Sequence, residues 1–232
     1  MSKNFAANAN NAHDTNDTDE TTEQSLMNIP APERRPLHFR IARLVSNILA
    51  PVTISVPLVI LVAMYDARNL ASSTSAVYYA CVAFFFLSIL PAAYIVIGVR
   101  LGKISDIGVN RRGERAGPFL FNTLSNMVGL FVLALLHGPK NLETLLIILA
   151  FMSAVLMVIT WWWKISMHTS SLSVTVTILT ALYGITVLPA YLLVVLVSWS
   201  RVVLRRHTVA QVIAGSLVSM ALATFVLLIR GV

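Results

Sequence analysis

Charged residues are scarce in this 232-residue chain and make up only 12% of the sequence. A soluble domain carries about 25% charged residues, whereas this chain is 57% hydrophobic and has a mean hydropathy of +0.78. These values exclude an ordinary soluble fold. They also exclude intrinsic disorder over most of the chain, because disordered sequences are poor in large apolar residues.

Cysteine is also scarce, since Cys81 is the only one in the chain. A disulfide scaffold is therefore excluded. The sequence has no ligand spacing typical of a zinc or iron site, and it has no glycine-rich phosphate loop. We expect neither a metal nor another cofactor, and no nucleic-acid partner.

The long apolar runs predict an all-α, polytopic transmembrane helix bundle with six or seven spans, because each crossing helix needs about 20 apolar residues. Seven apolar segments are present, at 44–64, 74–98, 119–137, 142–162, 171–187, 189–200 and 208–229. The fifth and sixth are the hardest to separate, and Gly184 to Pro189 is the expected break. The sixth is short for a complete crossing.

The charges divide the chain into two parts. Residues 1–29 contain one basic and five acidic residues, for a net charge of −4, and they show no apolar periodicity. We expect this stretch to be a disordered polar tail. Residues 30–232 form the predicted bundle, with 16 basic and five acidic residues and a net charge of +11.

If all seven segments cross the membrane, 13 of the 16 basic residues outside the tail face one side. The exceptions are Arg68, Lys140 and Arg230. Cytoplasmic loops are enriched in lysine and arginine. We therefore predict that the N-terminus and the basic face are cytoplasmic.

The basic side also carries most of the reactive side chains, in three polar clusters at 103–115, 164–169 and 200–211. Each cluster joins the end of one apolar segment to the start of the next, so the folded bundle can bring them together. Arginine matches phosphate oxygens with a planar set of donors, and histidine serves as a nucleophile or a general acid. His207 and Gln211 are four residues apart and share one helical face, where Gln211 can orient the imidazole.

The second and third clusters resemble motifs of the type 2 phosphatidic acid phosphatase superfamily of membrane lipid phosphatases. The family's third motif reads S-R-x5-H-x3-D. Ser200, Arg201 and His207 match it in residue type and spacing, but Gln211 occupies the aspartate position.

The other two motifs are less well kept. The second, P-S-G-H, is represented by Ser166 and His168 within the sequence Ile-Ser-Met-His. The first, K-x6-R-P, is only approximated, because seven residues separate Lys103 from Arg111. The resemblance extends over about residues 102–225, which would form a phosphatase-like core.

The resemblance implies roles for individual residues. His207 would be the nucleophile that forms a phosphohistidine, His168 would protonate the leaving alkoxide, and Gln211 would orient His207. The phosphate would be bound by Arg201, Ser166, Lys103, Arg111, Arg112, Arg115 and Lys164. The family works without a metal and hydrolyses lipid phosphates and diphosphates, including phosphatidate and isoprenoid phosphates. The expected partners are therefore a lipid phosphate and the bilayer, and no oligomeric state is predicted.

The glutamine at position 211 keeps a second interpretation open. A carboxylate stabilises the imidazolium that develops on a nucleophilic histidine, and a neutral amide adds no charge. Asp106 and Glu114 are candidates to supply that charge. Without it, the chain would be a catalytically weak or silent protein that binds lipid phosphates. A transporter with an arginine-lined path is disfavoured, because such a path would place charge at mid-membrane.

Overall fold

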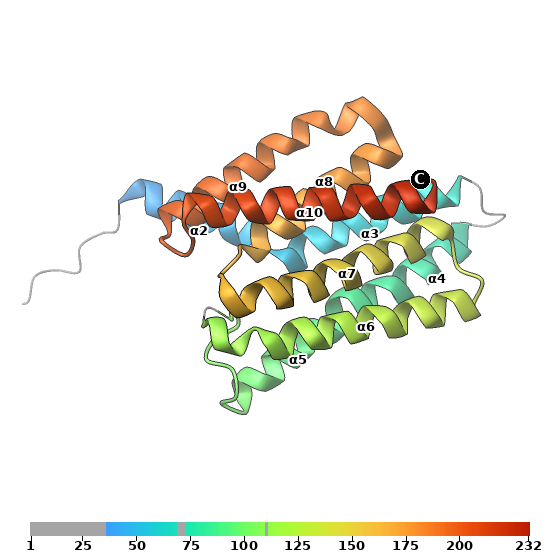
Figure 1. The fold of residues 1–232 in the computed structure, drawn as a ribbon. Helices are drawn as coiled ribbons and strands as arrows, with labels where there is room; N and C mark the ends of the chain where they lie inside the picture. Colours follow the sequence, from blue (N-terminus) through green and yellow to red (C-terminus); the bar gives the residue numbers. More distant parts are fainter. Residues whose placement is uncertain (1–35, 69–72, 110) are drawn as a thin grey trace, which may run out of the picture. The chain divides into compact units, whose positions relative to one another are not determined.

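The structure is a computed structural model in which residues 36–68, 73–109 and 111–232 are described. The described helices all belong to one unit, Leu37–Val232, and the predicted tail at 1–29 lies outside the described residues. In chain order the helices are α2 (Leu37–Ile48), α3 (Pro51–Ala67), α4 (Ser73–Phe84), α5 (Leu90–Arg100), α6 (Ala116–Leu135), α7 (Lys140–Trp162), α8 (Met167–Tyr183), α9 (Tyr191–Val203) and α10 (Val209–Arg230) (Figure 1). Three short helical turns lie between them: a π-helical turn η1 (Phe85–Ile89) and the 3-10 turns η2 (Arg112–Glu114) and η3 (Gly184–Ala190).

All regular secondary structure in the described part of the chain is helical, which confirms the predicted all-α class. Five helical stretches are long and apolar enough to cross a membrane, namely Ser75–Arg100, Ala116–Leu135, Lys140–Trp162, Met167–Val203 and Val209–Arg230. The pair α2 and α3, bent by 44°, makes a sixth if it is counted as one span. The described residues therefore form a polytopic bundle with five or six candidate spans, and six is the lower of the two predicted counts.

The predicted fifth and sixth segments lie within the single continuous stretch Met167–Val203. Gly184 follows α8 with φ +73°, a backbone conformation that glycine adopts readily, and η3 then leads into α9. Figure 1 shows α9 turning back alongside α8 after η3. With only 13 residues, α9 is about 20 Å long, which is less than the thickness of the bilayer core.

Helices α8 and α10 pack extensively against each other, and this packing shapes the polar end of the bundle. A Cβ atom at Gly215 would lie 3.0 Å from Thr169 Oγ1 and 3.1 Å from Ser170 Oγ, so glycine allows the two helices to come together. The Ser170 hydroxyl donates to the Gly215 carbonyl across this contact at 3.1 Å. The first turns of α8 and α10 are thereby held side by side.

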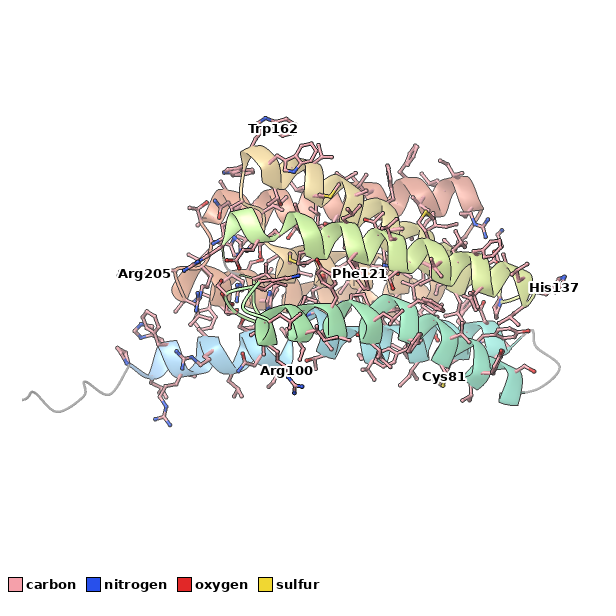
Figure 2. The ribbon with its side chains drawn as sticks, turned by 90° about the horizontal axis from the view of Figure 1, so that it is seen from below. Cys81, Arg100, Phe121, His137, Trp162 and Arg205 are labelled. Atoms are coloured by element: carbon pink, nitrogen blue, oxygen red, sulfur yellow. The ribbon has the colours of Figure 1, made fainter. Side chains whose placement is uncertain are left out.

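The two ends of the bundle differ in their loops. Figure 2 places Arg205 and Trp162 toward one end, and His137 and Cys81 toward the other. The first end collects the loops that precede α6, α8 and α10. These loops contain the three polar clusters, so the expectation that the fold can bring them together is met.

Candidate functional site

His207 and Gln211 form the centre of the site. His207 ends the loop between α9 and α10 and is buried, with 7% of its surface exposed. Its Nδ1 atom lies 3.1 Å from Gln211 Oε1, one turn into α10. Thr208 is the N-cap of α10 and forms a capping box with Gln211. The contact predicted from the four-residue spacing is therefore present.

The capping box also fixes the tautomer of His207. Gln211 Oε1 accepts a hydrogen bond from the Thr208 backbone N–H at 3.3 Å, so this atom is the amide oxygen. An oxygen can only accept from His207 Nδ1, and a neutral imidazole carries one N–H. The proton of the neutral ring is therefore on Nδ1, and the lone pair is on Nε2.

Arg201 is the second component of the site and is 9% exposed. Its Nη1 atom donates to Ser46 Oγ at 2.8 Å, whereas its buried Nε has no hydrogen-bond partner within the described chain. The backbone brings Arg201 close to His207, because Arg205 adopts φ +52° and the chain folds back over the end of α9. In this turn the Arg201 carbonyl accepts from the N–H groups of Arg206 and His207, at 3.1 and 3.3 Å.

The start of α8 contributes Ser166 and His168. Ser166 is the N-cap of the helix and is fully buried, and its hydroxyl has no hydrogen-bond partner among the described residues. His168 follows in the first turn, lies within electrostatic range of Arg201 and His207, and is hydrogen-bonded to the Ser46 backbone. The second and third sequence clusters therefore meet.

Arg115 joins the first cluster to the other two. This side chain is 3% exposed, and its Nε donates to the Val109 carbonyl while Nη1 donates to the Ile165 carbonyl, both at 3.0 Å. Ile165 immediately precedes Ser166. Arg115 therefore connects the loop before α6 to the N-cap of α8. Its two carbonyl partners are neutral and do not cancel its positive charge.

The electrostatics of the site are those of a cation cluster. Burial lowers the pKa of His207 to about 3, with further lowering by Arg201 and a smaller opposing effect of the hydrogen bond to Gln211. Burial also lowers the pKa of Lys164, and the charges of Arg115, Arg201 and Arg206 add to that effect. His207 is therefore neutral at neutral pH, and the region around it favours an anion.

At the opposite end of the bundle, an arginine is paired with a carboxylate. There Arg230 forms an ion pair with Glu143 at 3.1 Å. At the candidate site the partners of Arg115 are carbonyl oxygens and the partner of Arg201 is a hydroxyl. Among the described contacts, Arg230 is thus paired with a carboxylate, whereas these hydrogen bonds of Arg115 and Arg201 go to neutral acceptors, and Asp106 acts on Arg115 electrostatically.

Two predicted phosphate ligands are placed less centrally. Lys103 and Arg111 are exposed, and Arg111 lies 3.7 Å from Glu114 in an ion pair. The side chain of Arg112 lies outside what the structure describes. The residues that the structure brings together are therefore Arg115, Lys164, Ser166, His168, Arg201, His207 and Gln211.

The two carboxylates considered as substitutes for the missing aspartate are engaged elsewhere. Glu114 accepts from the backbone N–H and the hydroxyl of Ser105, both at 2.8 Å. Asp106 accepts from the Gly108 N–H at 2.8 Å and acts electrostatically on Arg115. Gln211 is the side chain that contacts His207 Nδ1.

Two residues of the site were not predicted. Ser46 contacts both Arg201 and His168, and no motif marks it in the sequence. Arg206 acts on Lys164 and Arg201, and its position beside His207 in the third cluster was an available signal.

No group of three or more histidine, cysteine, aspartate or glutamate side chains in the described residues is arranged to hold a metal ion. The chain matches no protein-family model, no curated protein sequence and no solved structure. The chemistry of the site must therefore be inferred from its own geometry.

Proposed function

We propose that this chain is an integral-membrane phosphatase that hydrolyses the phosphate ester or diphosphate of a lipid through a phosphohistidine. The observation that carries the proposal is the pairing of two buried, unpartnered donors with a neutral histidine. Arg201 Nε and Ser166 Oγ have no hydrogen-bond partner among the described residues, and Arg201 lies close enough to His207 to act on it electrostatically. Buried polar atoms usually have a hydrogen-bond partner, so these two donors suit a ligand with several acceptor oxygens.

Phosphate is the ligand that matches the charge and the donors. Arg201 and Arg115 supply guanidinium groups, and Lys164 adds an ammonium group whose charged form is disfavoured by burial and by its cationic neighbours. A phosphate dianion would relieve this repulsion and accept from the free donors. The cluster is therefore suited to bind a phosphate group more strongly than a neutral headgroup.

The reaction would proceed in two steps. His168 takes up a proton when the phosphate dianion binds beside it. His207 Nε2 then attacks the phosphorus atom, a P–N bond forms, and the P–O bond to the lipid breaks as His168 gives this proton to the leaving alkoxide. Neutral His168 then takes a proton from water, which attacks the same phosphorus atom. The P–N bond breaks, orthophosphate leaves, and both histidines return to their initial states.

An apolar cavity supports a lipid as the substrate. This cavity of about 150 Å³ lies among α3, η1, α5, α6, α7 and α8. One of its lining residues is Met167, which stands between Ser166 and His168 in the sequence, and another is Pro118, three residues after Arg115. A hydrocarbon chain in the cavity would leave its phosphate at the cation cluster.

The charge asymmetry leads us to place the site on the cytoplasmic side of the membrane. The loops at the site end contain most of the basic residues outside the tail. Part of that charge belongs to the proposed phosphate site. Arg40 and Arg43 on α2 are exposed and independent of it, and they favour the same orientation.

Gln211 favours a second candidate function. The amide orients His207 without adding the negative charge that would stabilise a developing imidazolium. A protein with this site could therefore bind lipid phosphates without turning them over. Such a binder would keep its affinity in the His207→Ala variant, whereas the phosphatase would lose its activity.

The deciding experiment is a phosphate-release assay on purified protein with phosphatidate and isoprenoid mono- and diphosphates. We expect release in the wild type and loss of release in His207→Ala and His168→Ala. His38→Ala removes an exposed histidine from α2 and serves as the control. Undiminished release by either site variant would contradict the phosphohistidine mechanism, and binding without release would favour the second candidate.

A further inference from the structure

Ser46 contacts two members of the candidate site from a helix that no motif covers. Its hydroxyl accepts from Arg201 Nη1 at 2.8 Å, across 155 residues of sequence. Its backbone is hydrogen-bonded to His168. With only 4% of its surface exposed, Ser46 is a buried residue that connects α2 to both α8 and α9.

The local sequence explains how α2 reaches the site. The chain leaves the helical conformation at Ala50, with ψ 149°, and Pro51 begins α3. The resulting bend of 44° separates α2 from the direction of α3. The two buried residues of α2, Ala42 and Ser46, are four positions apart and lie on one face, and α2 packs against α9.

The hydroxyl of Ser46 determines which Arg201 donors remain available. A guanidinium group presents five N–H donors in a rigid plane. Fixing Nη1 on Ser46 restricts rotation of this plane and leaves the buried Nε without a partner in the described chain. Arg201 is thereby held in advance with a donor free for a phosphate oxygen, which lowers the entropic cost of binding.

We propose that Ser46 is a positioning residue of the phosphate site, holding Arg201 through its hydroxyl and His168 through its backbone. This inference rests on the proposed function, since it assumes that Arg201 binds the phosphate. If Ser46 has this role, α2 is required to form the site. Because the bond to His168 uses the backbone, a side-chain substitution at Ser46 removes only the support of Arg201.

The test uses the purified full chain and orthophosphate as the probe. Binding of orthophosphate is measured directly by calorimetry, and its inhibition of phosphate release is measured alongside KM and kcat. We expect Ser46→Ala to weaken orthophosphate binding and to raise KM by about tenfold, the effect expected from one hydrogen bond to a charged group. The change in kcat should be much smaller.

Two further variants separate positioning from folding. Ser46→Thr keeps the hydroxyl and should restore binding to near the wild-type value. Ser219→Ala removes a hydroxyl that is also buried, but in the interior of α10, and should leave binding unchanged. Loss of binding in Ser46→Ala with recovery in Ser46→Thr supports the inference.

The outcomes also distinguish the inference from the proposed function. If the wild type neither binds orthophosphate nor releases it from any lipid, the phosphate site itself is wrong and the role of Ser46 is overturned with it. If the wild type binds orthophosphate and Ser46→Ala binds it as well as Ser219→Ala does, only the role of Ser46 is overturned.

Discussion

Gln211 Oε1 accepts from two donors at once, His207 Nδ1 at 3.1 Å and the Thr208 backbone N–H at 3.3 Å. The first contact orients the imidazole, and the second is part of the capping box that begins α10. A single neutral side chain thus links the start of a helix to the ring of the proposed nucleophile. The position therefore controls both geometry and charge, and the two can be varied separately.

Gln211→Asp is expected to increase phosphate release by at least about tenfold, because an anionic partner stabilises the imidazolium that forms during the reaction. Gln211→Asn is the matched control, since asparagine has the shape of aspartate without its charge. Initial rates of phosphate release measure the difference. Equal rates for the two variants would show that charge at position 211 does not limit the reaction.

The low pKa of His207 predicts how stability depends on pH. An unfolded histidine takes up a proton near pH 6.5, whereas folded His207 does so only near pH 3. Between these values the unfolded state binds more protons. The free energy of unfolding therefore falls as the pH is lowered through this window, by at most about 1.4 kcal/mol per pH unit for one proton.

Thermal unfolding in detergent between pH 7 and pH 4.5 measures this effect. His207→Gln has no imidazole at this position and should show a shallower decrease of the melting temperature than the wild type. Parallel curves for the two proteins would contradict the predicted proton uptake on unfolding.

Much of this site could be predicted from the sequence, because its main contacts are local or lie in motifs. The His207–Gln211 contact follows from a four-residue spacing, and Arg201 belongs to the same sequence motif, six residues before His207. Ser46 could not be predicted in this way, since its partner is 155 residues away and depends on how α2 packs against α9. The sequence also could not show that Arg115, rather than Arg111, lies at the site. This depends on tertiary structure, because Arg115 reaches the Ile165 carbonyl.

The helices were predicted more closely than their grouping into spans. Apolar runs mark α6, α7 and α10 to within three residues at each end. The division of Met167–Val203 depends on η3 and on the packing of α9 along α8, and hydropathy alone does not contain that information. The predicted first segment at 44–64 likewise falls across two helices, because the chain bends between α2 and α3 and α2 already begins at Leu37.

Gly215→Val is expected to destabilise the bundle by about 1–3 kcal/mol, the usual cost of forcing extra atoms into a packed contact. The new side chain would start 3.0 Å from Thr169 Oγ1 and 3.2 Å from the Ser166 carbonyl oxygen. It would push α8 from α10 and so separate His168 from His207. Melting temperature and phosphate release should both fall.

Gly113→Val provides the comparison for that experiment. A Cβ atom at Gly113 meets nothing within 4 Å, so this substitution should leave the melting temperature close to the wild-type value. If Gly215→Val and Gly113→Val melt at the same temperature, the close approach of α8 and α10 is not required for the stability of the bundle.

The apolar cavity predicts that kcat/KM for phosphate release depends on the length of the lipid chain. Ala92→Phe would fill part of the cavity and should lower kcat/KM for a long-chain lipid phosphate by about tenfold. A short-chain, soluble phosphate ester should be hydrolysed at the wild-type rate. Ala80→Phe places the same bulk in a separate apolar groove between α3 and α4 and is the control. An equal effect on long and short substrates would rule out this cavity as the chain site.

The charge asymmetry predicts which end of the bundle is accessible from outside the cell. In a Cys81→Ser background, Ile107→Cys introduces a thiol into the exposed loop at the site end, and His137→Cys introduces one at the opposite end. An impermeant thiol reagent added to intact cells should label His137→Cys and spare Ile107→Cys, because basic loops are retained in the cytoplasm. Labelling after cell lysis shows that both thiols can react. The reverse pattern in intact cells would place the site on the outer face, and the phosphate released by the enzyme would then appear outside the cell.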